Sequence, residues 1–356
     1  MVRLSRAQQQ ARNRARVLAA AREEFTERGY RDAKIDRIAD RADLTRGAVY
    51  SNFPGKRALY LSVLAETDGE PTERSTAPGH TAAEALGAFA RARVARLPLS
   101  ETDAPPRGGI TLSSEVLSDE PIRRAFAQLV HLDARLLGSA LEALETGTGR
   151  RVRVAETALI TLYGAGQMAE IAPGLTDPFN VIRACERIAD LDLEDDWPLP
   201  HLAHVPPAEL VDEPWTPPEV MDVVGGRPAV VGRDGLVLVL GIGRLEAAEE
   251  ALRAVPDGTP VMLAVVGDNP AEHVPLARAS LTDLYVCLRQ AFPAHAVPTL
   301  EVVLEGADAV AAAAGATDTG DDTETAVRVA GGRIVARSTV RGACHAVAVS
   351  AAVSED

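Results

Sequence analysis

The sequence is poor in the residues on which several classes of protein depend. Its 356 residues include three cysteines, Cys185, Cys287 and Cys344, which lie far apart in the chain. Their spacing suits neither a metal site nor a disulfide framework. No apolar run approaches the roughly 20 residues that a membrane span needs, and residues 1–30 lack the apolar core of a secretory signal. These absences predict a cytoplasmic protein with no membrane partner, no metal and no other cofactor.

Positive charge is scarce and unevenly placed. The formal net charge is −14, which taken alone disfavours binding to nucleic acid. Residues 1–66, however, hold 14 Lys and Arg against 8 Asp and Glu, whereas the remaining 290 residues hold 23 against 43. Both lysines of the chain, Lys34 and Lys56, lie in the first segment. A basic segment on an acidic body concentrates phosphate attraction in one place, although a solvated basic tail has the same composition.

The first 66 residues have the pattern of a small helical domain. Good helix formers and an apolar stripe predict a long first helix that ends near Gly29. The second helix is followed by a short turn. In this turn Asp43 tolerates a left-handed backbone, and Thr45 can cap the next helix. The predicted helices cover residues 7–28, 34–41 and 46–53, and a fourth begins at Lys56.

The third predicted helix has a face suited to DNA. Val49 and Phe53 share one side and suit the core, whereas small residues on the other side allow the backbone close to a groove. Arg46 can reach a guanine edge or a phosphate, and Tyr50 a phosphate oxygen. A lysine at the start of the fourth helix suits a phosphate clamp. The predicted DNA-binding residues are Lys34, Thr45, Arg46, Gly47, Ala48, Tyr50, Ser51 and Lys56.

A dense motif runs through this segment: Ile38-Ala39, then Ala42-Asp43-Leu44-Thr45-Arg46-Gly47-Ala48-Val49-Tyr50-Ser51-Asn52-Phe53, then Lys56 and Leu59. Over residues 12–64 it closely resembles the tetracycline-repressor (TetR) family. Asp43 stands where that family commonly has glycine. Arg57 stands where an acidic residue is usual, and it adds a potential phosphate contact. The resemblance implies a homodimeric, sequence-specific repressor on a palindromic operator in double-stranded DNA.

Residues 67–195 have an almost continuous helical pattern. The resemblance implies an all-helical ligand-binding and dimerisation domain, whose last two helices, about 151–171 and 177–191, pair with those of a second subunit. It also implies an effector pocket for an unknown small molecule, although residues of these types at helical spacing are more often part of an ordinary helical core. The candidate lining residues are Phe89, Phe126, His131, Leu159, Tyr163 and Met168.

The C-terminal part differs in character. Residues 196–222 are rich in proline and predict a linker or an extended strap. Residues 223–356 alternate buried-strand runs with helical runs and then form a hairpin with a Gly331-Gly332 turn. This order predicts an α/β domain with a mostly parallel sheet. The order and the hairpin are similar to thioredoxin-like domains of the peroxiredoxin type, but residues 241–248, where those domains keep a reactive cysteine, contain none.

The sequence thus predicts a multidomain protein: a helix-turn-helix domain and a helical domain, both all-α, followed by an α/β domain. The leading hypothesis is a transcriptional regulator, a repressor relieved by a small-molecule effector. Two alternatives concern the α/β domain, which is either an enzyme or a module that binds a protein partner. No phosphate-binding loop, nucleophile elbow or zinc-protease motif occurs, so the prediction is a protein without enzymatic activity.

Overall fold

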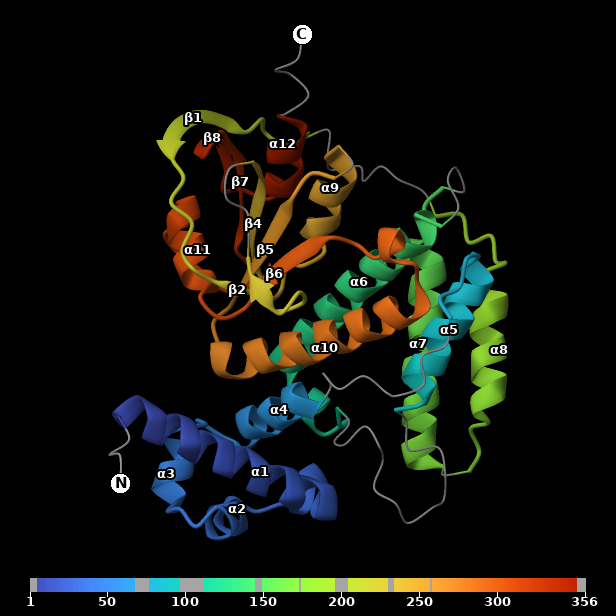
Figure 1. Ribbon diagram of the computed structural model, residues 1–356, viewed down its shortest axis with the longest axis vertical. Coiled ribbons are helices and arrows are strands. Elements are labelled where there is room, and N and C mark those ends of the chain that lie inside the picture. Colours follow the sequence, from blue (N-terminus) through green and yellow to red (C-terminus); the bar gives the residue numbers. More distant parts are fainter. Residues whose placement is uncertain are drawn as a thin grey trace.

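The structure is a computed structural model in which eight stretches of the chain are described. They are residues 5–67, 77–96, 112–144, 149–172, 174–195, 204–229, 234–256 and 258–350. Within them, all-helical parts lie on one side of the molecule and a sheet with its covering helices on the other (Figure 1). Residues 196–203 of the predicted linker lie outside the described residues.

The N-terminal helices follow the predicted order. Gly29 has φ 68° and breaks the helical geometry, but the first helix resumes and ends at Asp32, four residues later than expected. Asp43 has φ 48°, in the left-handed region, and the Thr45 side chain accepts a hydrogen bond from the Ala48 amide, so both turn predictions are confirmed. The helices are α1 (Arg6–Asp32), α2 (Ile35–Arg41), α3 (Arg46–Tyr50) and α4 (Lys56–Thr67).

Four α-helices make up the described part of the helical domain. Three of them begin where the sequence offers a start: Thr81 and Glu84 form a capping box, and Asp119 and Asp177 each cap a helix with proline in its first turn. α5 packs against α8, and α6 against α7. The bounds are α5 (Ala82–Val94), α6 (Glu120–Glu142), α7 (Val152–Ile171) and α8 (Pro178–Ile188).

Among its described residues, the C-terminal part contains a six-stranded sheet in the order β1-β8-β7-β4-β5-β6, in which β1 is Glu209–Pro214. Neighbours β4-β5-β6 are parallel and neighbours β1-β8-β7-β4 antiparallel, so the sheet is mixed and the prediction of a mostly parallel sheet is wrong. The tight hairpin makes the difference, because it forces antiparallel pairing on β7 and β8. The strands are β4 (Gly235–Gly241), β5 (Val261–Val266), β6 (Leu300–Val303), β7 (Glu324–Ala330) and β8 (Arg333–Ser338).

Helices cover both faces of this sheet. Strands β4 and β5 are buried along their whole length, and their alternate side chains enter two different hydrophobic clusters. This explains their near-continuous apolar runs. One face packs on α11 and the other on three helices (Figure 1). The helices are α9 (Ala247–Ala254), α10 (Pro270–Ala291), α11 (Ala307–Ala314) and α12 (Ala343–Val349).

Part of the predicted linker belongs to the sheet. Strand β1 (Glu209–Pro214) pairs antiparallel with β8, and Asp212 and Glu213 form ion pairs with Arg333 and Arg337. Strands β2 (Met221–Asp222) and β3 (Arg227–Pro228) form a separate two-stranded sheet. The segment was expected to be linker because prolines flank it, and proline is tolerated at a sheet edge.

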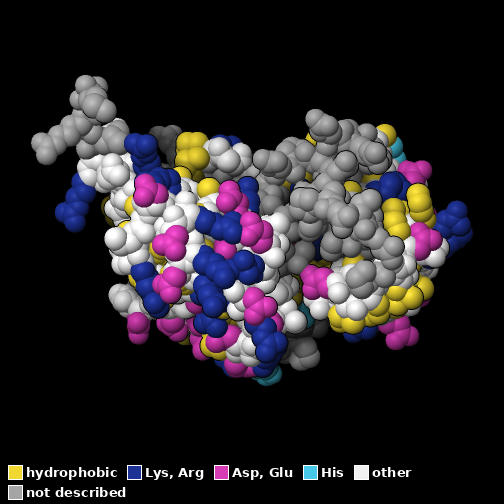
Figure 2. Space-filling model, turned by 90° about the horizontal axis from the view of Figure 1, so that it is seen from below, with side chains coloured by type: hydrophobic (Ala, Val, Ile, Leu, Met, Phe, Trp, Pro, Cys, Tyr) yellow, Lys and Arg dark blue, Asp and Glu magenta, His cyan; other side chains and the backbone are white. Residues whose placement is uncertain are grey.

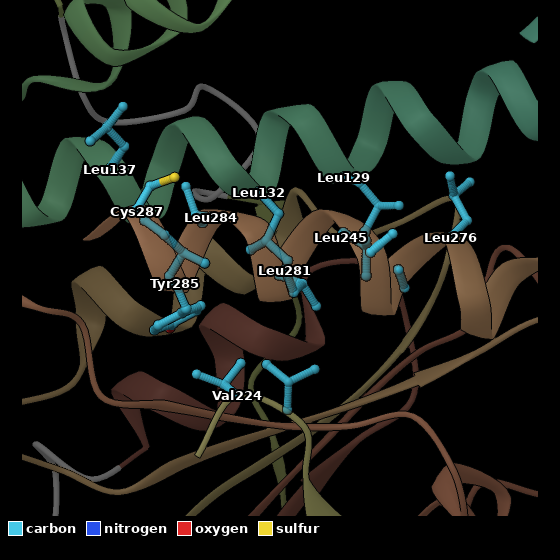
Figure 3. Close-up of a cluster of buried hydrophobic side chains, with 14 of the residues drawn as sticks. Leu129, Leu132, Leu137, Val224, Leu245, Leu276, Leu281, Leu284, Tyr285 and Cys287 are labelled. Atoms are coloured by element: carbon cyan, nitrogen blue, oxygen red, sulfur yellow. The ribbon is translucent and has the colours of Figure 1, made fainter. Parts of the chain in front are cut away.

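Helix α10 joins the two halves of the protein. It connects β5 to β6, yet it packs along α4, α5 and α6 (Figure 1). Its leucines, among them Leu276, Leu281 and Leu284, lie with Leu129 and Leu132 of α6 in one buried cluster (Figure 3). The helical domain and the α/β domain therefore share a hydrophobic core.

Candidate nucleic-acid interface

Helix α3 presents to solvent the face that the sequence predicts. Val49 is buried and Ala48 half-buried, whereas the remaining predicted residues on and beside α3 are exposed. Seen from the side of α1–α3, the surface carries Lys and Arg side chains interleaved with Asp and Glu (Figure 2). The exposed residues are Thr45, Arg46, Gly47, Tyr50 and Ser51.

Arg46 is held loosely beside α2. Its Nη1 lies 3.2 Å from Asp36 Oδ1, and its Nη2 lies 3.5 Å from the Tyr50 hydroxyl. The Arg46 side chain is 62% exposed and that of Asp36 67%. The Tyr50 hydroxyl and then the Asp36 carboxylate raise the pKa of Arg46. An exposed pair of this kind contributes about 0–1 kcal/mol, so Arg46 can exchange it for a base edge or a phosphate.

Lys34 and the buried acid beside it organise the start of α2. Lys34 is exposed at the N-cap position, and its backbone amide donates to Glu24 Oε1 at 3.3 Å. Glu24 is fully buried, with Arg28 and Arg41 each within 3.5 Å of one of its oxygens. Sequence analysis missed Glu24. The available signal was its place beside Phe25 on the apolar stripe of α1.

Lys56 has a structural contact in addition to its predicted one. Its Nζ donates to the Arg31 carbonyl at 2.9 Å and lies 4.9 Å from the centre of the Tyr30 ring. Burial lowers the pKa of Lys56. The ammonium therefore ties the end of α1 to the start of α4 with one of its three donors, and its contact with a phosphate stays a prediction.

Arg57 lies away from the DNA-facing surface. Its guanidinium pairs with Glu272 of α10 at 2.8 Å and with Asp119 at the start of α6 at 2.5 Å. These two carboxylates raise the pKa of Arg57, Glu272 first. They also explain why a basic residue stands where the TetR resemblance expects an acidic one. The potential phosphate contact of Arg57 is wrong in this arrangement, because its charge is already neutralised.

The six candidate pocket residues lie in different surroundings. Phe126 and Tyr163 meet edge to face, with ring centres 5.6 Å apart. Phe89 and Leu159 are core residues, buried to 0% and 1% exposure. The remaining two face solvent: His131, which lies 3.5 Å from Glu156, and Met168.

A cavity of about 720 Å³ lies elsewhere in the helical domain. The starts of α5 and α7 and the segment after α8 form it, and its lining is mainly polar. None of the six candidate residues lines it. Its charged lining residues are Arg150, Arg151, Asp190, Asp192 and Asp195.

The positions of the three cysteines suit a structural role rather than a redox one. All three are buried. Burial raises the pKa of Cys185 to about 11 and raises that of Cys344 well above its ordinary value. A thiol of this kind stays protonated at neutral pH and is a poor nucleophile. Among the described residues no group of three or more His, Cys, Asp and Glu could hold a metal ion, and no helix is long and apolar enough to cross a membrane.

Comparison with known proteins assigns the N-terminal domain. Residues 17–63 match the family model of the bacterial regulatory proteins of the tetR family. The HTH-type transcriptional activator FasR of Mycolicibacterium smegmatis is 47% identical over 51 residues, which are 14% of this chain and 23% of that protein. The HTH-type transcriptional regulator SrpR of Pseudomonas putida is 48% identical over 52 residues, 15% of this chain and 24% of that protein.

A solved transcriptional regulator from Rhodococcus sp. Rha1 aligns with 50% of this chain and 94% of its own, at 22% identity and a TM-score of 0.35. The chain matches about a quarter of the length of the two curated relatives. The matched residues contain α2, the turn at Asp43, α3 and most of α4. Residues 17–63 of this chain are therefore a DNA-binding helix-turn-helix domain of the tetR family.

Proposed function

We propose that the protein is a sequence-specific DNA-binding transcriptional regulator that acts as a homodimer. The observation that carries the proposal is the exposed face of α3 within a tetR-family domain. In this proposal α3 enters the major groove and Arg46 donates to a guanine edge. Tyr50 and Lys56 contact phosphates and fix the register of the helix on the duplex.

Gly47 supports this orientation of α3. A Cβ at this position meets only Thr45 Oγ1, at 3.9 Å, so the fold leaves room for a side chain. Glycine inside a helix costs about 1 kcal/mol relative to alanine. A residue that weakens the helix and relieves no crowding inside the protein suits the approach of something outside it, which in this proposal is DNA.

The α7–α8 surface supports the dimer. Ile160, Ile171, Leu175 and Phe179 are 67–73% exposed, and nothing lies within 4 Å of a Cβ built on Gly164. Hydrophobic side chains gather at the end of the molecule away from α1–α3 (Figure 2). An apolar helical face of this kind suits a symmetric contact with a second copy, as the TetR resemblance implies. Such a dimer binds two half-sites, so its operator is a palindrome.

We also propose that the protein represses transcription and that a small molecule relieves the repression. The polar cavity of about 720 Å³ beside the starts of α5 and α7 is a candidate site for that molecule. One of the relatives is named an activator, so the direction of regulation needs its own assay. A promoter carrying the operator ahead of a reporter gene separates the two: repression lowers reporter output, and activation raises it.

We assign no catalytic role to the α/β domain. Residues 241–248, the place of a redox cysteine, contain none, and burial raises the pKa of Cys344 in this domain. A thioredoxin-like fold stays a proposal. Its support is the order of β4, α9 and β5 at the start of the domain and of the hairpin β7-β8 and α12 at its end.

The test is selection of bound sequences from random DNA. Full-length protein is expected to enrich a palindromic motif. Tyr50→Phe and Lys56→Ala are expected to weaken binding uniformly across sequences, because phosphate contacts carry no base information. No enriched motif at moderate salt would refute the proposal.

A further inference from the structure

The DNA-binding domain is held by the α/β domain as well as by its own chain. α4, the last helix of the DNA-binding domain, packs along α10. α10 is a crossover between two strands of the sheet, so its position follows the sheet. Because α10 belongs to the α/β domain and packs against the DNA-binding domain, a movement of the α/β domain also moves the DNA-binding domain.

Polar contacts fix α10 to each helix beside it. Glu272 pairs with Arg57 of α4, and Ser280 donates to Asp133 of α6 at 2.8 Å. Asp283 pairs with Arg93 of α5 and with Arg96, which lies two residues beyond the end of α5. The two acids are largely shielded, with Glu272 11% and Asp283 16% exposed. Shielded ion pairs demand good geometry, and they therefore define one register between the helices.

A second set of contacts ties the α/β domain to the start of α7. Glu249 of α9 is buried and accepts hydrogen bonds from Arg135 of α6 at 2.6 Å and Arg150 at 2.7 Å. Arg253 donates to the same carboxylate at 2.8 Å. Arg150 lies two residues before α7 begins. The α/β domain thus contacts α4 through Glu272 and the start of α7 through Glu249.

We infer that the α/β domain sets the angle between the DNA-binding domain and the dimer surface, through the interdomain contacts of Glu272 and Glu249. The inference rests on the proposed function as a DNA-binding dimer. In a symmetric dimer this angle decides how far apart the two α3 helices lie, and hence which half-site spacing the protein accepts. The α/β domain then determines which distance between half-sites the dimer prefers. A movement of α10 therefore changes which operators the protein binds.

The experiment measures spacing discrimination. Affinity is determined for the selected palindrome, for versions with one base pair added or removed between the half-sites, and for a single half-site. The variants are Arg57→Met, Glu272→Gln and the double substitution. Matched controls are Arg278→Met and Glu305→Gln, which break an ion pair between α10 and the segment before α11.

The expected result is a loss of discrimination of about fivefold or more in all three variants, within the usual range of coupling between sites. The double variant is expected to match Arg57→Met, because that substitution already removes the pair with Glu272 together with the pair with Asp119. Affinity for the single half-site and all values for the controls stay at the wild-type level. Unchanged discrimination in the three variants would overturn the inference.

A phosphate contact by Arg57 gives a different result. Arg57→Met then weakens single half-site binding and reduces its salt dependence, while Glu272→Gln behaves as wild type. That outcome also overturns the inference.

Hydrogen exchange provides a readout without DNA. Glu272→Gln is expected to speed amide exchange in α4, and Glu305→Gln to leave it unchanged. If wild-type protein binds no DNA, the proposed function fails. The stabilisation of α4 by α10 is then tested by hydrogen exchange alone. Equal amide exchange rates of α4 in Glu272→Gln and Glu305→Gln would contradict it.

Discussion

The surface beside α3 and the junction around α10 use charge in opposite ways. Beside α3 the ion pairs are exposed, as in Arg46–Asp36 and Arg16–Asp43. At the junction the acids are enclosed, with Glu249 only 5% exposed among three arginines. A surface pair is exchanged readily for a phosphate. An enclosed pair cannot be opened without leaving a buried charge, so it holds shape.

The largest effect is expected at Glu249. Glu249→Gln removes the carboxylate that Arg135, Arg150 and Arg253 share, while Arg150 keeps Asp195 and Arg253 keeps Glu142. Removing one partner of a buried ion pair costs about 3–5 kcal/mol, and the remaining carboxylates place the expected loss at the lower end of this range. Urea unfolding measures this free energy, with the exposed Glu305→Gln expected to stay within about 0.5 kcal/mol of wild type. A loss below about 1 kcal/mol at Glu249 would remove the distinction between enclosed and surface pairs.

The buried Asp133 of the junction makes the stability of the protein depend on pH, which an exposed carboxyl does not. Burial raises the pKa of this carboxyl to about 6 from an ordinary 3.8, against the opposing effects of Ser280 and Arg93. Because the folded pKa is the higher one, stability that is full below about pH 4 is lost as pH rises through about 6. Asp133→Asn has no proton to lose and keeps an acceptor for Ser280.

Asp133→Asn is therefore expected to gain stability relative to wild type between pH 4 and 7, by about 3 kcal/mol at most. Unfolding midpoints across this pH range measure the gain, and Asp36→Asn on the exposed surface is the control. A constant difference between Asp133→Asn and wild type at all pH values would contradict this account of Asp133.

A smaller effect is expected on the proposed dimer surface. Phe179 is 73% exposed on α8, and truncating a central aromatic residue of an interface costs about 2 kcal/mol. Phe179→Ala should weaken the dimer about 30-fold by sedimentation equilibrium. The control is Leu210→Ala on β1, where the side chain is 80% exposed. Equal dimer affinity in both variants would place the interface elsewhere.

The smallest effect is expected at Gly47, where two readouts should move in opposite directions. Gly47→Ala should stabilise the free protein by up to about 1 kcal/mol through helix propensity, while weakening binding to a single half-site. Unchanged DNA binding by Gly47→Ala would argue against close approach of α3 to DNA.

The DNA-binding domain could be predicted because its signals are local. The Thr45 cap and the left-handed Asp43 lie within a few residues of the helices that they define. The buried strands β4 and β5 were equally recognisable, since their apolar runs have few alternatives in a covered sheet. Mixed pairing and strand β1 escaped prediction, because a strand's partner is chosen by tertiary structure.

The position of α10 could not be predicted for the same reason. Its leucines indicate a buried helix, but not which elements bury it. The unusual Arg57 was visible in the sequence, whereas its partner Glu272 lies 215 residues further along the chain. A single sequence gives no means of joining two such positions, so Arg57 was assigned to a phosphate.

The most direct test of the central claim is a base-by-base binding map of the selected operator. Each base pair is changed in turn, and affinity is measured for wild-type protein and for Arg46→Ala. The account predicts that Arg46→Ala loses about 1–3 kcal/mol and relaxes discrimination at one position in each half-site, symmetrically. A uniform loss over all positions, or no loss, would contradict the claim that α3 of this chain recognises base sequence through Arg46.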